Sequence, residues 1–383
     1  MDKPSRLPAI DMLRGLVIVL MALDHTRDFF GPNAINPEDL AHTTPAWFWT
    51  RWITHLCATV FVLLAGSSAF LRGQGSGVPA LSRYLASRGA LLLLLEATWV
   101  SFSWQFGYNM IVMQVLWALG AGMIGLAALV WRPRPLIAVV AALLIVTHNA
   151  FDGWHPGGVL WMAWHGGGYQ PIVKGQFGIV FMYPLMPWLG LIAAGYALGP
   201  VFLWERARRQ RFLLTAAALL MLAFVALRAG NLYGDPEPWS PQGRGALFDL
   251  MSFVRVHKYP PSLLYLCVTG SIGLALLALL ERVRPVRLLA LFGHTPMFFY
   301  LVHIALAHFL GLLYFRARYG VMPDFVRGQL VTPPGYEPSL PVVYAAWLGL
   351  LALMAGLTLM WLRWRRTPDT VRPADTGLGE AKA

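Results

Sequence analysis

The sequence predicts an all-α, polytopic integral membrane protein: a helical bundle of about 10 transmembrane helices with both termini in the cytoplasm. The first observation is composition, because the chain is 57% hydrophobic and 13% charged. A soluble domain carries roughly 25% charged residues. The second is that the apolar residues gather in long runs that recur along the whole chain. The third is that basic residues cluster in every second loop between the apolar runs.

The length of a membrane-crossing helix delimits the individual elements. About 20 apolar residues cross the hydrocarbon core of a bilayer as a helix. This length predicts ten spans, at residues 9–28, 46–71, 86–105, 108–130, 135–150, 179–203, 212–230, 260–280, 288–314 and 340–362. The fifth is short and the ninth long for a single crossing.

The basic residues set the orientation of these spans. Lys and Arg concentrate on the cytoplasmic side of membrane proteins. Grouping the loops alternately gives one side most of the 30 basic residues, including RARRQR at 206–211 and RWRR at 363–366. The formal net charge of +12 therefore reflects topology, and we expect no nucleic-acid partner. We expect one transmembrane domain at 1–366 and a flexible polar cytoplasmic tail at 367–383.

The outer side of the predicted bundle carries the groups suited to chemistry. All histidines except His294 fall in outer loops or in the middle-to-outer part of a span, alongside Asp24, Asp28 and Asp152. Histidine is the side chain best suited to proton transfer near neutral pH. The asymmetry predicts an outward-facing reaction chamber. The alternative is that long outer loops simply tolerate polar residues.

The outer end of the first span carries four ionisable groups within five residues. His25 and Asp28 are three residues apart, so a carboxylate can orient the imidazole. Asp24 and Arg27 have the same spacing and can form a second pair. An ionisable group near the middle of a bilayer costs about 2.5–3.5 kcal/mol on insertion scales, which favours a functional reason for it.

The inner end of the same span holds Asp11 and Arg14, also three residues apart and therefore on one face. Two interpretations stay open for this pair. It is either a structural ion pair or a contact for a substrate.

Other spans add candidates. His42 lies just ahead of the second span, and His55 lies in its outer half. Glu96 is the one acid in the third span; an intramembrane Glu is a functional candidate, with pairing to an Arg of another span as the alternative. In the ninth span, Tyr300 and His303 share a helix face.

Several motifs that would indicate other chemistry are discounted, and no metal is predicted. Cys57 and Cys267 are too far apart for a ligand pair or a disulfide framework. The G-x-G-x-x-G match at 120–125 lies inside an apolar span and predicts helix packing. The HGGG at 165–168 has no accompanying G-x-S-x-G. A metal site assembled from distant histidines remains an alternative.

Four ordered blocks resemble a known family. They are R-L-x-x-I-D-M-L-R-G-L-x-x-x-L-M-x-x-D-H from Arg6 to His25, ITHLCATVFVLLAGSSAFL at 53–71, KYPPSLLYLCVT at 258–269 and LFGHTPMFFYLVHIALAH at 291–308. The chain resembles the bacterial branch of the heparan-α-glucosaminide N-acetyltransferase catalytic-domain family, within the transmembrane acyltransferase group. The resemblance implies a polytopic enzyme of the bacterial cytoplasmic (inner) membrane. Such an enzyme takes acyl-CoA from the cytoplasm and modifies a sugar or similar acceptor on the far side.

The resemblance also suggests two catalytic histidines. Aligned on Gly66-Ser67-Ser68, the family's catalytic His in the loop before the second span falls within a few residues of His42. The family carries Asn where this chain has His25, whereas the wider acyltransferase group usually has a catalytic His near that position. The loop between His25 and His42 is longer here, so the division of labour between the two stays open.

The sequence therefore predicts an O- or N-acyltransferase that uses acetyl-CoA as acyl donor. His25 or His42 would be the general base, or form an acetyl-His intermediate, and Asp28 or Asp24 would set its tautomer. The proposed substrate contacts are His303, Tyr300, His55 and Glu96; the proposed CoA contacts are Arg14 and Arg88.

The expected partners are acyl-CoA, a carbohydrate or cell-envelope acceptor, the lipid bilayer and, as a further candidate, a second copy in a homodimer. A second hypothesis is a transporter that couples protons or substrate through His25, Glu96 and His303. A third is haem ligation by paired histidines of different spans.

Overall fold

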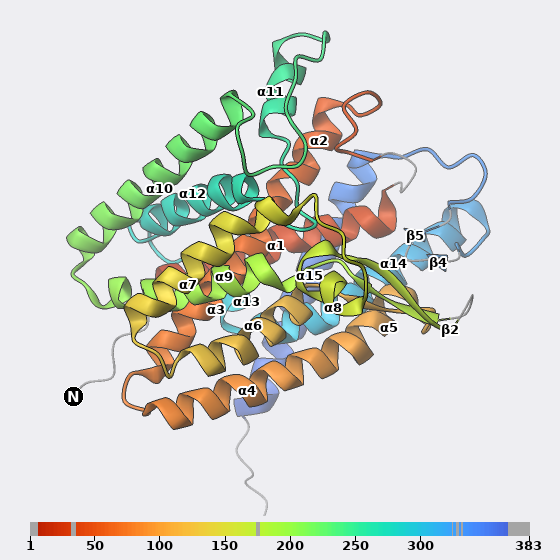
Figure 1. Ribbon diagram of the computed structural model, residues 1–383. Coiled ribbons are helices and arrows are strands. Elements are labelled where there is room, and N and C mark those ends of the chain that lie inside the picture. Colours follow the sequence, from red (N-terminus) through yellow and green to blue (C-terminus); the bar gives the residue numbers. More distant parts are fainter. Residues whose placement is uncertain are drawn as a thin grey trace, which may run out of the picture.

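The computed structural model describes residues 7–31, 36–173, 177–323, 325–326, 329–330 and 332–366 (Figure 1). The described chain is mostly helical, which confirms the predicted all-α polytopic class. The predicted tail at 367–383 lies outside the described residues.

The helices follow one another along the chain, and the connections between them range from none to long loops. The N-terminal half contains α1 (Pro8–Phe30), α2 (Pro45–Trp52), η1 (Ile53–His55), α3 (Leu56–Gly73), α4 (Val78–Leu95), η2 (Glu96–Val100), α5 (Ser101–Gln105), α6 (Val115–Leu129), α7 (Arg134–Thr147), η3 (His148–Phe151), α8 (Val159–Trp161) and η4 (Met162–Gly166). The C-terminal half contains α9 (Leu185–Leu198), η5 (Gly199–Leu203), α10 (Arg206–Ala229), α11 (Ala246–Val254), α12 (Leu263–Leu280), α13 (Arg287–His294), α14 (Pro296–Tyr319) and α15 (Leu340–Arg366).

Eight helical segments are long and apolar enough to cross a membrane: Pro45–Gly73, Val78–Gln105, Arg134–Phe151, Leu185–Leu203, Arg206–Ala229, Leu263–Leu280, Pro296–Tyr319 and Leu340–Arg365. The remaining two predicted spans also correspond to helices. α6 is apolar but shorter, and α1 has 23 residues but is too charged to qualify by composition.

The position of α1 explains how a membrane bundle accommodates its charges. α1 packs against α3, α12, α13, α14 and α15, and in Figure 1 it lies between α10 and α4, which are at opposite edges of the bundle. Most of its side chains are buried. Protein therefore surrounds its ionisable groups, which is where such groups occur in membrane proteins.

A small sheet was not predicted. β1 (Met110–Met113) pairs in parallel with β3 (Phe177–Phe181), which also pairs antiparallel with β2 (Gly168–Val173). The predicted starts of the fourth and sixth spans, at 108 and 179, were therefore wrong, because α6 begins at Val115 and α9 at Leu185. Short apolar runs such as MIVM and FGIVF do not distinguish strand from helix by hydropathy. A second, two-stranded sheet pairs β4 (Phe325–Val326) with β5 (Gln329–Leu330).

Small residues let α3 and α9 pack with their backbones in contact, as the Gly-Ser-Ser cluster predicts. A Cβ atom on Gly66 would lie 2.0 Å from the carbonyl oxygen of Ile192, and one on Gly195 would lie 2.1 Å from that of Leu63. The hydroxyl of Ser67 donates to the carbonyl oxygen of Gly195 (3.0 Å). Close approach of this kind drives helix association in membranes.

Candidate active site

Two arginines neutralise the carboxylates at the outer end of α1. Nη1 of Arg51, from α2, lies 2.9 and 2.8 Å from the two carboxylate oxygens of Asp24. Nη2 of Arg27 donates to Asp24 (3.0 Å) and to Asp28 (2.6 Å). The predicted pair of Asp24 with Arg27 is confirmed. Asp28, however, bonds Arg27, whereas the hydrogen-bond partner of His25 is an imidazole.

That imidazole belongs to His303, on α14. Nδ1 of His25 lies 2.7 Å from Nε2 of His303, and the planes of the two rings are nearly parallel, at 15° to each other. His303 is fully buried and His25 is half-buried. Two residues that are 278 positions apart thus form a direct pair between α1 and α14.

The hydrogen bonds of the pair define its tautomers. Nδ1 of His303 lies 2.8 Å from the carbonyl oxygen of Phe299. A carbonyl oxygen only accepts, so Nδ1 of His303 carries a proton, and in the neutral ring Nε2 is an acceptor. His25 must then donate from Nδ1, which leaves Nε2 of neutral His25 unprotonated. Within the described part of the chain, no group hydrogen-bonds this nitrogen.

Two further polar atoms lie beside the imidazole pair. The ring of Trp104 meets the ring of His25 edge-on at 5.0 Å, and the ring of Tyr300 meets that of His303 at 5.7 Å. The indole nitrogen of Trp104 and the hydroxyl of Tyr300 are buried and have no hydrogen-bond partner among the described residues. Such groups are available to a bound molecule, because a buried polar atom is stabilised by acquiring a partner.

Glu38 extends the site from the loop that follows α1. Its carboxylate lies 3.0 Å from Nε2 of His55, which is fully buried, and 3.7 Å from Nε of Arg51. Burial alone would raise the pKa of Glu38, but His55 and Arg51 outweigh it and hold the pKa well below its usual range. Glu38 is therefore an ionised part of the network.

Lys258 is a buried cation next to this network. The residue is 7% exposed, and its ammonium lies 5.2 Å from the ring centroid of Tyr259. No carboxylate pairs with it among the residues that the structure describes. Burial would raise the pKa of Tyr259, yet Lys258 and Arg51 lower it. The positive potential at this point is suited to an anionic group or a developing oxyanion.

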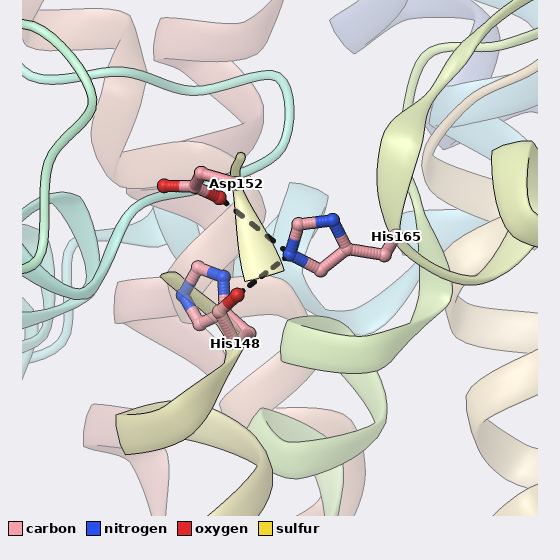
Figure 2. A group of neighbouring side chains, drawn as sticks. All are labelled: His148, Asp152 and His165. Carbon is pink, nitrogen blue, oxygen red and sulfur yellow. Dashed lines mark hydrogen bonds and ion pairs between the residues drawn. The ribbon is translucent and has the colours of Figure 1, made fainter. Parts of the chain in front are cut away.

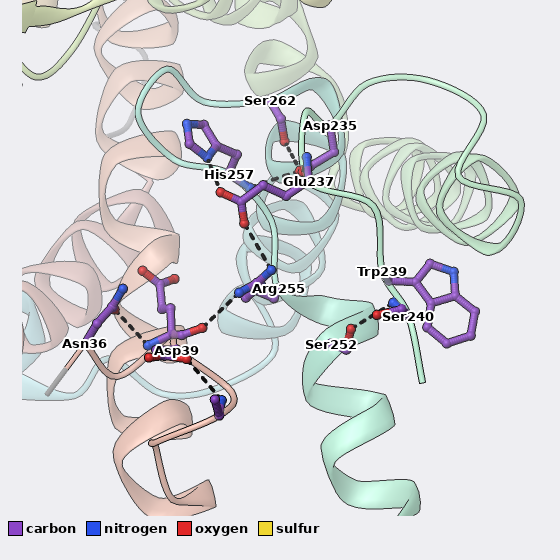
Figure 3. A network of polar contacts seen from close by, with 12 residues as sticks. Asn36, Asp39, Asp235, Glu237, Trp239, Ser240, Ser252, Arg255, His257 and Ser262 are labelled. Atoms are coloured by element: carbon purple, nitrogen blue, oxygen red, sulfur yellow. Dashed lines mark hydrogen bonds and ion pairs between the residues drawn. The ribbon is translucent and has the colours of Figure 1, made fainter. Parts of the chain in front are cut away.

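The outer loops hold these groups in place through a polar network (Figure 3). Arg255 donates to the carbonyl oxygen of Glu38 (3.2 Å) and pairs with the carboxylate of Glu237 (3.2 Å). The same carboxylate lies 3.2 Å from Nδ1 of His257. These contacts tie the loop that carries Glu38 to the segment that carries Lys258.

His42 lies apart from the imidazole pair. Its side chain is 78% exposed, and its Nδ1 lies 2.7 Å from the carboxylate of Asp39, at the surface of the same loop. The structure thus brings His25, Asp24 and His303 together but leaves His42 on the exposed side of the loop.

Glu96 caps a helix. Its carboxylate accepts from the backbone N–H groups of Gln114 (2.8 Å) and Leu116 (3.0 Å) at the start of α6. A carboxylate at a helix N-terminus satisfies otherwise unpaired N–H groups and complements the helix dipole. The predicted alternative, an ion pair with an Arg of another span, is wrong for the described residues.

Arg14 lies in a separate polar cluster at the inner end of α1. It donates to the carboxylate of Asp11 (2.9 Å), the carbonyl oxygen of Gly293 (3.2 Å) and the hydroxyl of Ser68 (3.3 Å). The structure contains the Arg14–Asp11 ion pair, one of the two interpretations that the sequence left open. Arg88 lies half-buried on α4.

Sequence reasoning missed five residues of the site: Glu38, Arg51, Trp104, Lys258 and Tyr259. The sequence around Arg51 does indicate a buried ion pair, because a cation inside the apolar run WFWTRWITHL needs a buried counter-ion. Lys258 and Tyr259 open the block KYPP, which forms part of the resemblance to the family but has no spacing that indicates a role in the site.

The fold and this site define a polytopic integral membrane protein with an imidazole pair and an ion-pair network inside its helical bundle. The family model described as heparan-alpha-glucosaminide N-acetyltransferase, catalytic, matches residues 6–231, more than half of the 383-residue chain. The chain belongs to this family and is a membrane acetyltransferase, so the predicted enzyme class is confirmed. The match contains Asp24, His25 and Arg51, whereas Lys258 and His303 follow it. No curated protein matches the chain.

Proposed function

We propose that the enzyme transfers an acetyl group from cytoplasmic acetyl-CoA to a hydroxyl or amine of a sugar or other cell-envelope acceptor, with His25 as the general base. The membrane would be the bacterial cytoplasmic membrane, and the unit would be the single transmembrane domain at 1–366. The observation that carries this proposal is the His25–His303 hydrogen bond, because its tautomers leave Nε2 of His25 free to accept a proton.

The proposed reaction uses His25 twice. Nε2 of His25 takes the proton of the acceptor O–H or N–H while that oxygen or nitrogen bonds to the thioester carbonyl carbon. As the carbon–sulfur bond breaks, His25 returns the proton to the sulfur, so CoA leaves as the thiol and the imidazole is neutral again. His303 acts as a positioning residue, since its Nε2 accepts from Nδ1 of His25 throughout.

The cations beside the His25–His303 pair would stabilise the negative charge of the transition state. Lys258 has no carboxylate partner among the described residues, so its charge can stabilise the negative carbonyl oxygen of the transition state. Arg51 contributes less, because Asp24 already neutralises it. Tyr300, Trp104 and the nearby His55 would orient the acceptor.

The donor would enter from the cytoplasmic side. His25 follows Arg14 by eleven residues, and a helix rises 1.5 Å per residue, so about 16 Å separate them along α1. An extended pantetheine arm spans a distance of this order between CoA phosphates at the inner end and a thioester at His25. Arg14 and Arg88 are the proposed phosphate contacts. Arg88 is the stronger candidate for a phosphate contact, because Arg14 already has three hydrogen-bond partners.

The burial of His25 favours it over His42 as the base, because proton transfer to the thioester site requires a group inside the bundle. Nε2 of His25 is also the nitrogen that would carry an acetyl group if the reaction proceeds through acetyl-His. Glu96 would affect the site indirectly, by holding the start of α6.

The test uses full-length protein in nanodiscs with acetyl-labelled acetyl-CoA, first alone and then with amino-sugar and polyol acceptors. Wild type should release free CoA and transfer or hydrolyse the label. His25→Ala should lower the rate about 100-fold or more, the usual contribution of a general base. His42→Ala and the exposed-loop control His155→Ala should each stay within about twofold of wild type.

An unchanged rate in His25→Ala together with loss in His42→Ala would contradict the proposal and move the base to the outer loop. Label retained on wild-type protein but not on His25→Ala would assign the acetyl-His route. Thermal unfolding of each variant separates loss of chemistry from loss of folding.

A further inference from the structure

A second group of side chains with ligand chemistry lies at the outer end of α7, outside the acetyl-transfer site. His148 and Asp152 come from η3 and the turn after it, and His165 comes from η4 (Figure 2). One ligand atom of each residue lies within 4.8 Å of the other two. Figure 2 shows the three side chains around a common space. Two imidazoles and a carboxylate form a donor set typical of transition-metal sites.

The His148 ring is a buried polar group whose nitrogens have no hydrogen-bond partner among the described residues. The residue is 0% exposed. A neutral imidazole has one donor and one acceptor nitrogen, and leaving both unsatisfied in a buried position is unfavourable. A bound metal ion would occupy the acceptor nitrogen.

The other two ligands are already oriented. The side-chain amide of Asn149 donates to Oδ2 of Asp152 (2.8 Å), and the other oxygen, Oδ1, lies 3.5 Å from Nε2 of His165. The ring of Trp161 stacks on His165 with a centroid distance of 5.1 Å. Hydrogen bonds and packing of this kind fix metal ligands in productive orientations.

We propose that His148, Asp152 and His165 bind a first-row divalent transition metal, of which Zn²⁺ is the representative. Zinc bonds to imidazole nitrogen and carboxylate oxygen are about 2.0–2.2 Å long. Tetrahedral ligand atoms then lie about 3.3 Å apart, so ligand atoms that are up to 4.8 Å apart approach one another by up to about 1.5 Å on binding. Nε2 of His165 now donates to the carbonyl oxygen of His148 (2.7 Å). The metal takes the place of that proton, which is released to solvent.

A cavity adjoins one of the proposed ligands, Asp152. A hollow of about 300 Å³ lies beside Asp152 and Asn149 and is also lined by Arg228, Tyr233 and Asp235. Three protein ligands leave one coordination position for water or another oxygen ligand. The metal would also join the outer end of α7 to η4. This site is independent of the acetyl-transfer proposal.

The test measures metal binding by the full-length protein, purified with a tag that contains no histidine and stripped with a chelator. Titration with Zn²⁺ should give one site per chain, and Co²⁺ should give the visible absorption of a tetrahedral complex. His148→Ala and Asp152→Asn should each weaken Zn²⁺ binding at least about 10-fold, because loss of a supporting residue alone costs 10–100-fold. His155→Ala, in the same outer loop, is exposed and should bind like wild type.

Equal binding in wild type, His148→Ala and Asp152→Asn would identify an adventitious ion only and overturn the proposal. Failure of wild type to retain Zn²⁺ or to give the Co²⁺ spectrum would do the same. Asp152→Asn keeps the shape of the side chain, so it tests coordination even if His148→Ala does not fold. Zn²⁺ should raise the thermal midpoint of wild type and His155→Ala, but not of Asp152→Asn.

Discussion

The two ends of α1 carry similar charges but differ in how their neighbours use them. At the inner end, Asp11 and Arg14 bond each other, and Arg14 also bonds α3 and α13. At the outer end, Asp24 is similarly neutralised by arginines, but the adjacent His25 retains a nitrogen with no partner in the described chain. The buried Lys258 also lacks a carboxylate partner there.

The two ends of α1 also differ in backbone packing. A Cβ on Gly15 would lie 1.9 Å from the carbonyl oxygen of Leu289, and one on Gly293 would lie 1.8 Å from that of Asp11. The inner end is thus a close helix junction, where the charges hold α1 against α13. In this protein, an ionisable residue of a membrane helix therefore indicates function when one of its polar atoms has no protein partner.

The largest expected effect comes from filling the inner junction. Gly15→Val should prevent stable folding, with a loss of more than about 4 kcal/mol, because its side chain would overlap the backbone of α13. The matched control is Gly349→Val on α15, where a Cβ meets nothing within 4 Å. Yield and thermal midpoint in detergent measure both. A well-folded Gly15→Val would break the distinction between the two ends.

The next effect comes from the outer ion pair. Asp24→Ala leaves Arg51 buried without its main partner and should cost about 3–5 kcal/mol. The double variant Asp24→Leu with Arg51→Met should recover much of this stability, because it removes both charges, while acetyl transfer stays impaired. Equal stability of Asp24→Ala and wild type would mean that solvent reaches Arg51.

Glu38 makes the stability of the outer end depend on pH. Its folded-state pKa lies below the ordinary Glu value of about 4.3. The stabilisation is therefore present above pH ~4.3 and is lost as the pH falls toward the folded-state pKa. Glu38→Gln should be less stable than wild type by about 2 kcal/mol at pH 7, and the difference should shrink with acidification. Asp39→Asn, which alters an exposed neighbour, should show little change at either pH.

The smallest effect distinguishes the two arginines proposed to contact CoA. Arg88→Ala should raise KM for acetyl-CoA about fivefold, equivalent to about 1 kcal/mol, with little change in stability. Arg14→Ala should chiefly lower the thermal midpoint, since it breaks three hydrogen bonds. A raised KM in Arg14→Ala without a loss of stability would show that the inner end of α1 also binds substrate.

Much of the fold could be predicted from the sequence, because span length and the placement of basic residues are local properties. The short strands β1 and β3 could not, since their pairing joins segments almost 70 residues apart. Residues three apart on one helix gave correct ion pairs for Asp11–Arg14 and Asp24–Arg27. The His25–His303 bond depends on how α1 meets α14, so spacing alone assigned His25 to Asp28 instead.

The most direct test of the central claim is ¹⁵N NMR of the imidazole nitrogens of His25 and His303 in the protein near neutral pH. Resonances are assigned by comparing wild type with His25→Ala and His303→Ala. The hydrogen bonds predict a neutral His25 with its proton on Nδ1 and an unprotonated Nε2, next to a neutral His303 protonated on Nδ1. A proton on Nε2 of His25 would contradict the account, because that nitrogen would then have no lone pair with which to act as a base.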